Sequence, residues 1–154
     1  MDGLILIDKP QNFTSHRVVI EIRKILNIKK VGHYGTLDPI VTGLLVIAVG
    51  KATKLFPFFS KADKVYKGQI RLGYSTDTYD SQGKHTSSEK KVYPSKEHLL
   101  GKMKKFEGEM DQIPPPFSAK KYKGKPLYAL AREKKEFELR SSKVFIHFFQ
   151  AKSL

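Results

Sequence analysis

Two short apolar runs with a helical stretch between them constrain the fold of this chain most strongly. Residues 4–7 (LILI) and 44–49 (LLVIAV) have the length and composition of buried strands. The stretch between them, residues 14–26, carries apolar residues at helical spacing, and Thr14 or Ser15 can cap that helix. The pattern predicts a core built from strands that pack against an amphipathic helix.

Length and composition restrict the class of protein. The chain has 154 residues, which corresponds to one domain, residues 1–154, and its 40% hydrophobic and 29% charged residues exclude a disordered or membrane protein. The longest apolar run, residues 43–50, is too short to span a bilayer, and no secretory signal is found. Cysteine is absent, which excludes disulfides, thiol nucleophiles and cysteine-based zinc sites. We therefore expect a cytoplasmic protein with no membrane partner.

The net charge indicates the kind of partner. There are 29 Lys and Arg against 15 Asp and Glu, so the net charge is +14. A compact domain with that excess attracts polyanions, and nucleic acid is the leading partner. An anionic membrane surface is disfavoured because the sequence contains no long basic amphipathic helix.

The order of predicted elements indicates the fold class. Residues 27–39 read as a loop, and residues 74–94 as a long polar connection that is functional or disordered. The other predicted elements are a helix at 51–59, a strand at 65–73, a helix at 95–108 with Ser95 as its cap, a stiff segment at 113–117, a hairpin at 117–128 that turns near Lys123 and Gly124, a short helix at 127–135 and a strand at 143–151. Strands and helices alternate without a regular βαβ rhythm, which predicts an α+β fold.

Asp38 is the most unusual residue of the sequence. It lies in VGHYGTLDPIVTGLL, residues 31–45, among glycines and apolar residues, and Pro39 pushes its backbone toward extended conformations. A carboxylate in an apolar frame needs a partner or a chemical task, but most Asp-Pro pairs are turn or cap residues. His33 shares this stretch, yet no second histidine stands at metal spacing, so no metal is expected. Sequence alone leaves the functional and structural interpretations of Asp38 open.

Two further stretches carry candidate residues, each with a structural alternative. STDTYDSQG supplies Asp77 and Asp80, whose spacing does not fit a calcium loop and is typical of Asx turns. The second stretch, SAKKYKGKPLYALAR at residues 118–132, interleaves tyrosines with basic residues. This pattern suits either a phosphate-lined path with base stacking or a solvated hairpin. Its lysines are Lys120, Lys121, Lys123 and Lys125.

Four stretches in a fixed order establish a family resemblance. They are GLILIDKPQNFTSHRVV, VGHYGTLDPIVTGLLVIAVGKATK, VYKGQIRLGYSTDTYDSQG and IPPPFSAKKYKGKPLYALARE. Together they strongly resemble the N-terminal part of the catalytic domain in the TruB family of tRNA pseudouridine synthases. The resemblance extends from Leu4 to about Ala131. It implies a mixed, mostly antiparallel sheet flanked by helices.

The resemblance also implies an activity. The family isomerises the uridine at position 55 in the T-loop of tRNA to pseudouridine. The glycosidic bond to N1 is cut, the uracil turns and C5 joins the same sugar carbon, with no cofactor or metal. The target nucleotide must leave the loop and enter a pocket. Asp38 matches the catalytic aspartate, and its apolar frame would then exclude water and strengthen the action of its charge on the sugar. The resemblance implies the T-arm of tRNA as partner and a monomeric protein.

Other residues match family positions one by one. His33 matches the histidine that helps hold the T-loop, and Tyr66 matches the tyrosine that stacks on the uracil. Lys9 and Pro10 match a pair that buttresses the active-site loop. Asp77 and Asp80 match a stretch near the pocket, and the lysines at 120, 121, 123 and 125 match an RNA-facing segment.

Two departures from the family pattern affect these expectations. The family usually has Thr where Tyr34 stands. Members also continue into a G-T-Y-I-R-type motif, whose arginine pairs with the catalytic aspartate, and into a PUA domain, and neither is found here. We therefore expect a fragment in which Asp38 is buried beside no cation and activity is low, unless Lys9 or Arg71 substitutes. The alternative function is a tRNA-binding or tRNA-folding module without catalysis.

Overall fold

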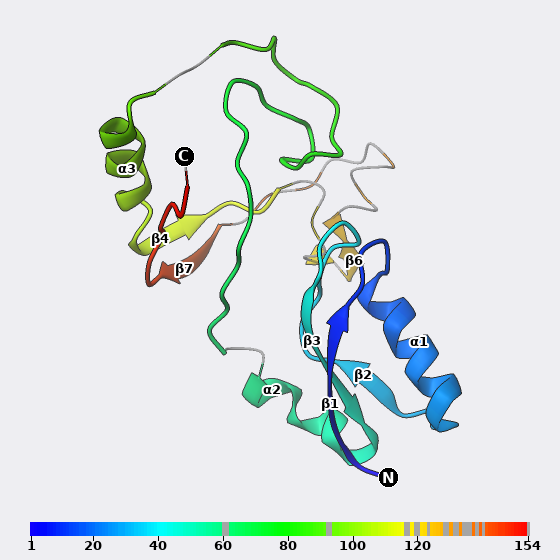
Figure 1. Ribbon diagram of the computed structural model, residues 1–154. Coiled ribbons are helices and arrows are strands. Elements are labelled where there is room, and N and C mark those ends of the chain that lie inside the picture. Colours follow the sequence, from blue (N-terminus) through cyan, green and yellow to red (C-terminus); the bar gives the residue numbers. More distant parts are fainter. Residues whose placement is uncertain are drawn as a thin grey trace. The chain divides into compact units, whose positions relative to one another are not determined.

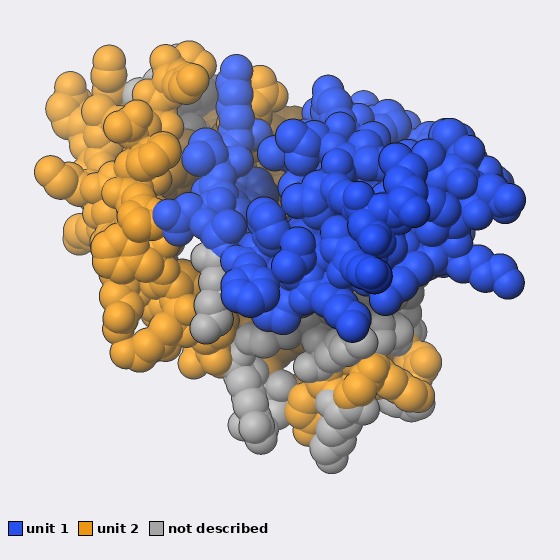
Figure 2. Space-filling model, turned by 90° about the horizontal axis from the view of Figure 1, so that it is seen from below, with its two compact units in different colours: residues 1–67 blue, residues 68–154 orange. Residues whose placement is uncertain are grey.

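The chain divides into two compact units. The computed structural model describes residues 1–59, 62–91, 94–115, 118, 121–122, 124–127, 130, 133, 137, 139 and 141–153. Unit 1 is Met1–Lys67 and unit 2 is Gly68–Leu154, and Figure 2 colours them separately. Length alone indicated one domain, and the assignment of the whole chain to a single catalytic domain stays a prediction.

A three-stranded antiparallel sheet forms the centre of unit 1 (Figure 1). β1 (Gly3–Lys9) and β2 (Val31–His33) pair with opposite edges of β3 (Gly43–Val49), in the order β1-β3-β2. In this register Ile5 lies opposite Ile47. Both predicted buried runs are therefore strands, each slightly longer than its apolar stretch.

The core of unit 1 lies between this sheet and helix α1 (Ser15–Leu26). Its buried members are Val18, Val19, Val31, Leu45, Ile47 and Val49. Fully burying one such aliphatic side chain contributes about 1.5–3 kcal/mol. On the other face of the sheet, Leu4 and Leu6 are 42% and 67% exposed. The strand alternation thus divides β1 into a core face and an open face.

Helix α1 begins and ends with recognisable caps. The Thr14 hydroxyl accepts a hydrogen bond from the N–H of Arg17 at 3.0 Å, so Thr14, and not Ser15, is the cap. The helix ends at Asn27, which has a left-handed φ of 53°. The apolar stripe predicted from the helical spacing is Val18, Ile22, Ile25 and Leu26. Val18 is buried and Ile22 and Leu26 pack against the core, as expected, whereas Ile25 is 75% exposed.

The segments that flank β3 differ in part from the prediction. β2 lies inside the predicted loop at 27–39, because three residues with a central glycine are too few to show an alternation. The predicted helix at 51–59 is confirmed, but it starts as a 3-10 helix, η1 (Gly50–Leu55), and continues as α2 (Phe56–Phe59).

Within its described residues, unit 2 contains helical segments and two small antiparallel ladders. Helix α3 (Lys96–Lys104) starts where predicted, and the Ser95 hydroxyl accepts a hydrogen bond from the N–H of His98 at 3.2 Å. β4 (Gly108–Gln112), which was not predicted, pairs with β7 (Ser142–Ile146). The predicted hairpin is confirmed by the pairing of β5 (Lys121–Tyr122) with β6 (Lys125–Pro126). The mixture of helices and antiparallel strands confirms the α+β class.

The predicted strand at 65–73 is wrong. This segment forms no strand, and Val65, Tyr66 and Ile70 are 79%, 75% and 73% exposed. Alternation identifies a chain that is able to form a strand, but a strand exists only where its N–H and C=O groups meet a partner edge. The predicted strand at 143–151 exists as β7 but is shorter, since β7 ends at Ile146. The predicted helix at 127–135 and the end of the segment at 113–117 lie mostly outside the described residues.

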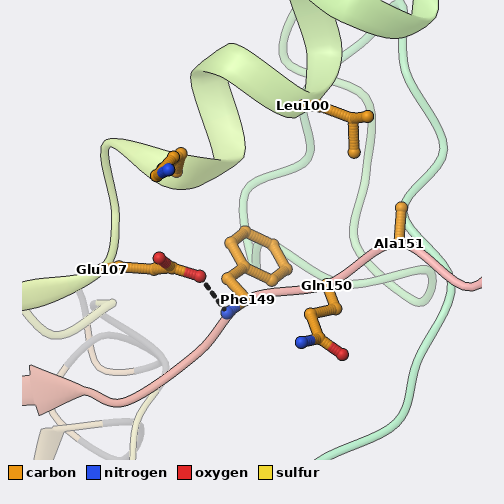
Figure 3. A pocket seen from close by; sticks show the side chains of 6 residues that line it. Leu100, Glu107, Phe149, Gln150 and Ala151 are labelled. Carbon is orange, nitrogen blue, oxygen red and sulfur yellow. Dashed lines mark hydrogen bonds between the residues drawn. The ribbon is translucent and has the colours of Figure 1, made fainter.

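A shallow hollow in unit 2 lies beside α3 (Figure 3). It has a volume of about 410 Å³ and is lined by Leu100, Lys104, Glu107, Phe149, Gln150 and Ala151. The Glu107 carboxylate accepts a hydrogen bond from the N–H of Phe149 at 2.9 Å and so ties the chain after β7 to the end of α3. None of the sequence-predicted site residues lines this hollow.

In the described part of the chain, no helix has the length and apolar character needed to cross a membrane.

Candidate active site

Asp38 lies in the loop that connects β2 to β3 in unit 1. Its side chain is exposed, which corrects the expectation that this carboxylate is buried in an apolar frame. Across the described ranges, no hydrogen bond or ion pair reaches the carboxylate. The loop therefore carries a free and exposed carboxylate.

The residue before Asp38 is held by helix α1. The Ser15 hydroxyl accepts a hydrogen bond from the N–H of Leu37 at 2.9 Å and donates one to the C=O of Leu37 at 3.2 Å. Ser15 is 2% exposed, so these bonds are shielded from water. Its position as the first residue of α1 places the hydroxyl beside the loop.

The residues after Asp38 are held by the turn between β1 and α1. The N–H of Asn12 donates a hydrogen bond to the C=O of Pro39 at 2.7 Å, and the side-chain amide of Gln11 donates one to the C=O of Ile40 at 3.1 Å. Asn12 has a left-handed φ of 66°, which asparagine tolerates better than most residues. Asp38 thus stands between two fixed stretches of backbone.

Lys9 supports the turn that makes these contacts. Its side chain is fully buried, and its ammonium donates hydrogen bonds to the C=O of Pro10 at 2.9 Å and to the C=O of Phe13 at 2.7 Å. A buried ammonium needs such partners, and in turn it fixes the carbonyls of the turn. This geometry supports the buttressing role predicted for Lys9 and Pro10, although their part in catalysis stays a prediction.

His33 ends β2 and is half-buried. Its Nδ1 pairs with the C=O of Gly35, and because a carbonyl only accepts, Nδ1 carries a proton. The other ring nitrogen, Nε2, is left for a different partner. The predicted contact of His33 with the RNA loop is untested.

Tyr34 stands where the family usually has threonine, and its larger side chain is used for packing. Its ring stacks on Phe59 with centroids 5.0 Å apart and planes 21° apart, and it lies 6.0 Å from the ring of Phe56. Its hydroxyl donates a hydrogen bond to the C=O of Ala52. The side chain therefore attaches the loop that carries Asp38 to η1 and α2.

Tyr66 lies at the end of unit 1 in a segment without regular structure. Its ring is 75% exposed, which contradicts the alternative that Tyr66 is a core residue of a strand. An exposed aromatic face suits the predicted stacking on uracil, and that role stays a prediction.

Asp77 and Asp80 lie in unit 2 and organise their own loop. One Asp77 oxygen accepts a hydrogen bond from the N–H of Lys84 at 2.8 Å. Asp80 accepts hydrogen bonds from the Thr78 hydroxyl at 2.7 Å and from the N–H of Gln82 at 2.9 Å. The bond from the Gln82 N–H supports the Asx-turn interpretation for Asp80, whereas Asp77 bonds across the loop to a residue seven positions on. A position near a substrate pocket stays a prediction for both.

The two cations considered as substitutes for the family's arginine are engaged elsewhere. Lys9 binds carbonyl groups, and Arg71 forms an ion pair with Glu89 at 2.7 Å. Arg71 also lies 5.2 Å from the ring centroid of Tyr74. Lys9 lies in the same unit as Asp38, and within the described residues of that unit the two side chains share no bond.

The predicted RNA-facing lysines are only partly described. Lys120 and Lys123 lie outside the described residues, and Lys121 is described only as backbone of β5. Lys125 is exposed on β6. Among the residues that the structure describes, no three or more His, Asp or Glu side chains cluster in a way that could hold a metal ion.

Sequence reasoning missed the residues that fix the loop. Gln11 and Asn12 precede a helix and look like ordinary turn residues, and Ser15 looks like a cap. One signal was available, since two adjacent cap candidates, Thr14 and Ser15, leave one hydroxyl for another task. The contacts themselves join residues 22 to 29 positions apart, at Ser15–Leu37 and Gln11–Ile40, so no local pattern reveals them.

Comparison with known proteins defines the class. The model of the TruB family of pseudouridylate synthases, N-terminal domain, matches residues 23–154. The chain belongs to this family. The tRNA pseudouridine synthase B of Solibacter usitatus (strain Ellin6076) is 46% identical over 147 residues, which cover 96% of this chain and 50% of that protein. That of Aquifex aeolicus (strain VF5) is 46% identical and covers 96% of this chain and 51% of its own length. The chain therefore spans about half the length of these curated relatives.

A solved structure supports the same fold. The crystal structure of a Cbf5-Nop10-Gar1 complex contains a chain that is 34% identical and aligns with a TM-score of 0.52. The alignment covers 77% of this chain and 31% of that one. The fold class expected from the sequence is thereby confirmed.

Proposed function

We propose that this chain is the N-terminal part of the catalytic domain of a tRNA pseudouridine synthase, which isomerises uridine 55 in the T-loop of tRNA. Membership of the TruB family and the identities to tRNA pseudouridine synthase B support this activity. The observation that carries the proposal is the free, exposed Asp38 carboxylate between two anchored backbone segments.

The geometry suits chemistry on a substrate that arrives from outside. The reaction breaks the N1–C1′ bond and forms a C5–C1′ bond, with loss of the C5 proton and gain of a proton at N1. Asp38 either attacks C1′ or removes a proton from the sugar, and each role needs an ionised carboxylate held at a fixed point. The bound nucleotide would supply the apolar cover that the free chain lacks. No cofactor or metal is required by this proposal.

Other residues have supporting roles in the proposal. His33 contacts the T-loop, Tyr66 stacks on the uracil, and Lys125 with its neighbouring lysines contacts phosphates. The protein acts as a cytoplasmic monomer whose partner is the T-arm of tRNA.

A second candidate function is a tRNA-binding or tRNA-folding module without catalysis. The specific observation in its favour is that, among the described residues of unit 1, no Lys or Arg side chain bonds to Asp38. Both functions use the same basic RNA-facing surface, so binding alone does not separate them.

Pseudouridine formation in an unmodified tRNA distinguishes the two. The assay uses the 154-residue chain and a chimera, in which this chain replaces the matching half of the Aquifex aeolicus synthase. We expect the chimera to be active, the chain alone to be much slower, and Asp38→Asn in the chimera to abolish turnover while tRNA binding persists.

Asp8→Asn is the matched control, since Asp8 is an exposed carboxylate in the same unit. It should leave turnover unchanged. Measurable turnover by the Asp38→Asn chimera in a tritium-release assay would contradict the catalytic assignment. A chimera that binds tRNA and isomerises nothing would favour the non-catalytic module.

A further inference from the structure

Tyr79 has an unusual backbone for an aromatic residue. It lies in unit 2 with a left-handed φ of 61°, and its side chain is 73% exposed. Glycine and asparagine adopt this conformation at low cost, whereas a bulky side chain does so only where its surroundings impose it. Neither a core contact nor backbone preference explains a tyrosine at this position.

The loop tip around Tyr79 imposes the conformation. The N–H of Tyr79 donates to the C=O of Thr76 at 3.3 Å, and the Thr76 hydroxyl donates to the C=O of Asp80 at 2.8 Å. Thr76 is itself buried. Gly83 packs so closely that an added Cβ would collide with Thr76, Asp77 and Thr78. The backbone on both sides of the tyrosine is therefore fixed.

The tip stands on an ordered antiparallel ribbon, residues 73–90. The N–H of Lys90 donates to the C=O of Gly73 at 2.8 Å, and the N–H of Thr86 donates to the C=O of Ser75 at 2.9 Å. Tyr74 stacks on His85 with ring centroids 4.1 Å apart. The ribbon thus presents the Tyr79 ring from a rigid support, which reduces the entropy lost when the ring binds a ligand.

The ribbon carries two basic and three acidic side chains, a net charge of −1. Lys84 and Lys90 oppose Asp77, Asp80 and Glu89, and both tip aspartates accept hydrogen bonds from the loop itself. Attraction to phosphates is accordingly weak at the tip. What the tip offers is an exposed aromatic face, and aromatic faces bind unpaired nucleobases by stacking.

We propose that the Tyr79 ring is a stacking platform for an unpaired base of the RNA substrate, separate from the base that is isomerised. The proposal rests on the proposed function only in taking RNA as the partner, and it needs no catalysis. An apolar side chain of a protein partner is the competing occupant, and the test below separates the two.

The test measures the affinity of the 154-residue chain for an unmodified T-arm hairpin by fluorescence anisotropy at low and high salt. Tyr79→Gly removes the ring and suits the left-handed backbone, so the fold should be at least as stable as before. We expect this variant to lose affinity about 5- to 150-fold, by a similar factor at both salt concentrations. Tyr79→Phe should bind like the wild type.

Lys84→Ala is the contrasting control, since any loss of a phosphate contact shrinks as salt rises. Hairpins with one abasic site at each unpaired position then locate the base. The abasic site opposite Tyr79 should remove the difference between the wild type and Tyr79→Gly.

Equal affinities of Tyr79→Gly and the wild type for the intact hairpin would overturn the proposal, as would a difference that persists at every abasic site. The first result would leave an apolar side chain of a protein partner as the occupant, and the second would show that the ring contacts the RNA without stacking on an unpaired base. If the chain binds the hairpin through Tyr79 but the chimera isomerises nothing, the proposed activity fails and the stacking site stands.

Discussion

The hydroxyl of Ser15 holds both main-chain groups of Leu37, with its oxygen 2.9 Å from the Leu37 nitrogen and 3.2 Å from the Leu37 oxygen. Through this one side chain, the start of α1 fixes the residue that precedes the candidate catalytic aspartate. The position of Asp38 therefore depends on a helix that contributes no reacting group.

Replacing Ser15 with Ala should loosen the loop. The change leaves the N–H and C=O of Leu37 without this partner in a buried place, which should lower the free energy of unfolding by about 1–3 kcal/mol. Urea denaturation measures the loss, and hydrogen exchange of the Leu37 amide shows where it arises. Thr14→Ala is the control, because it removes the helix cap, costs about 1 kcal/mol, and leaves the bonds to Leu37 in place. Unchanged exchange at Leu37 in Ser15→Ala would contradict this account.

Lys9 is the second structural support of the loop, and Lys9→Met should show it. Methionine keeps most of the apolar stem but leaves the carbonyls of Pro10 and Phe13 without their donor, so we expect a loss of about 1–3 kcal/mol in unfolding free energy. Lys64→Met is the matched control, since the Lys64 ammonium also binds a carbonyl, that of Ala62, but on the exposed surface. It should change stability by no more than about 0.5 kcal/mol. Equal losses in the two variants would show that burial of Lys9 is unimportant.

The interactions of Tyr34 are of two kinds, its ring contacts with Phe56 and Phe59 and its hydrogen bond to Ala52, and mutation can separate them. Tyr34→Phe keeps the stack on Phe59 and loses the bond to Ala52, which should cost about 1 kcal/mol. Tyr34→Thr, the usual family residue, loses both contacts and should cost about 1–3 kcal/mol. Thermal unfolding measures both. If Tyr34→Thr were as stable as the wild type, the contacts with α2 and η1 would be incidental.

Tyr66 should affect turnover more than binding or stability. Because its ring is 75% exposed, Tyr66→Ala should unfold within about 0.5 kcal/mol of the wild type. In the chimera, loss of stacking on the uracil should slow single turnover by about tenfold or more, while the affinity for tRNA falls less, since phosphate contacts supply most of it. Tyr66→Phe should retain the rate. A Tyr66→Ala chimera with full turnover would remove Tyr66 from the site.

Local patterns predicted those elements whose stability is local. The helix at 15–26 was visible because a cap, an apolar stripe and a left-handed end residue all lie within its own sequence. The runs in β1 and β3 were visible because both strands are rich in apolar residues, although β1 buries only one of its two faces. Residues 65–73 show the limit of this reasoning, since alternation specifies two faces but not the partner edge that makes a strand.

The surroundings of Asp38 differ from those expected, and its catalytic role stays a prediction. The family motif points to Asp38, but its apolar neighbours in sequence, such as Leu37 and Ile40, are only partly buried and do not enclose the carboxylate. Exposure is decided by which segments pack over a loop, and those contacts join distant parts of the chain. The same is true of Ser15, whose hydroxyl has its partner 22 residues away.

The hydrogen bonds that Gln11, Asn12 and Ser15 make to the Asp38 loop end on main-chain atoms of Leu37, Pro39 and Ile40. Substitutions at Pro39 and Ile40 therefore leave these hydrogen-bonding groups in place, whereas the Leu37 side chain also packs against the core of unit 1. The groups that hold these main-chain atoms belong to Gln11, Asn12 and Ser15, which lie outside the loop. Grafting this loop into another scaffold would thus require the turn and the helix start to travel with it, since the loop sequence alone does not encode its shape.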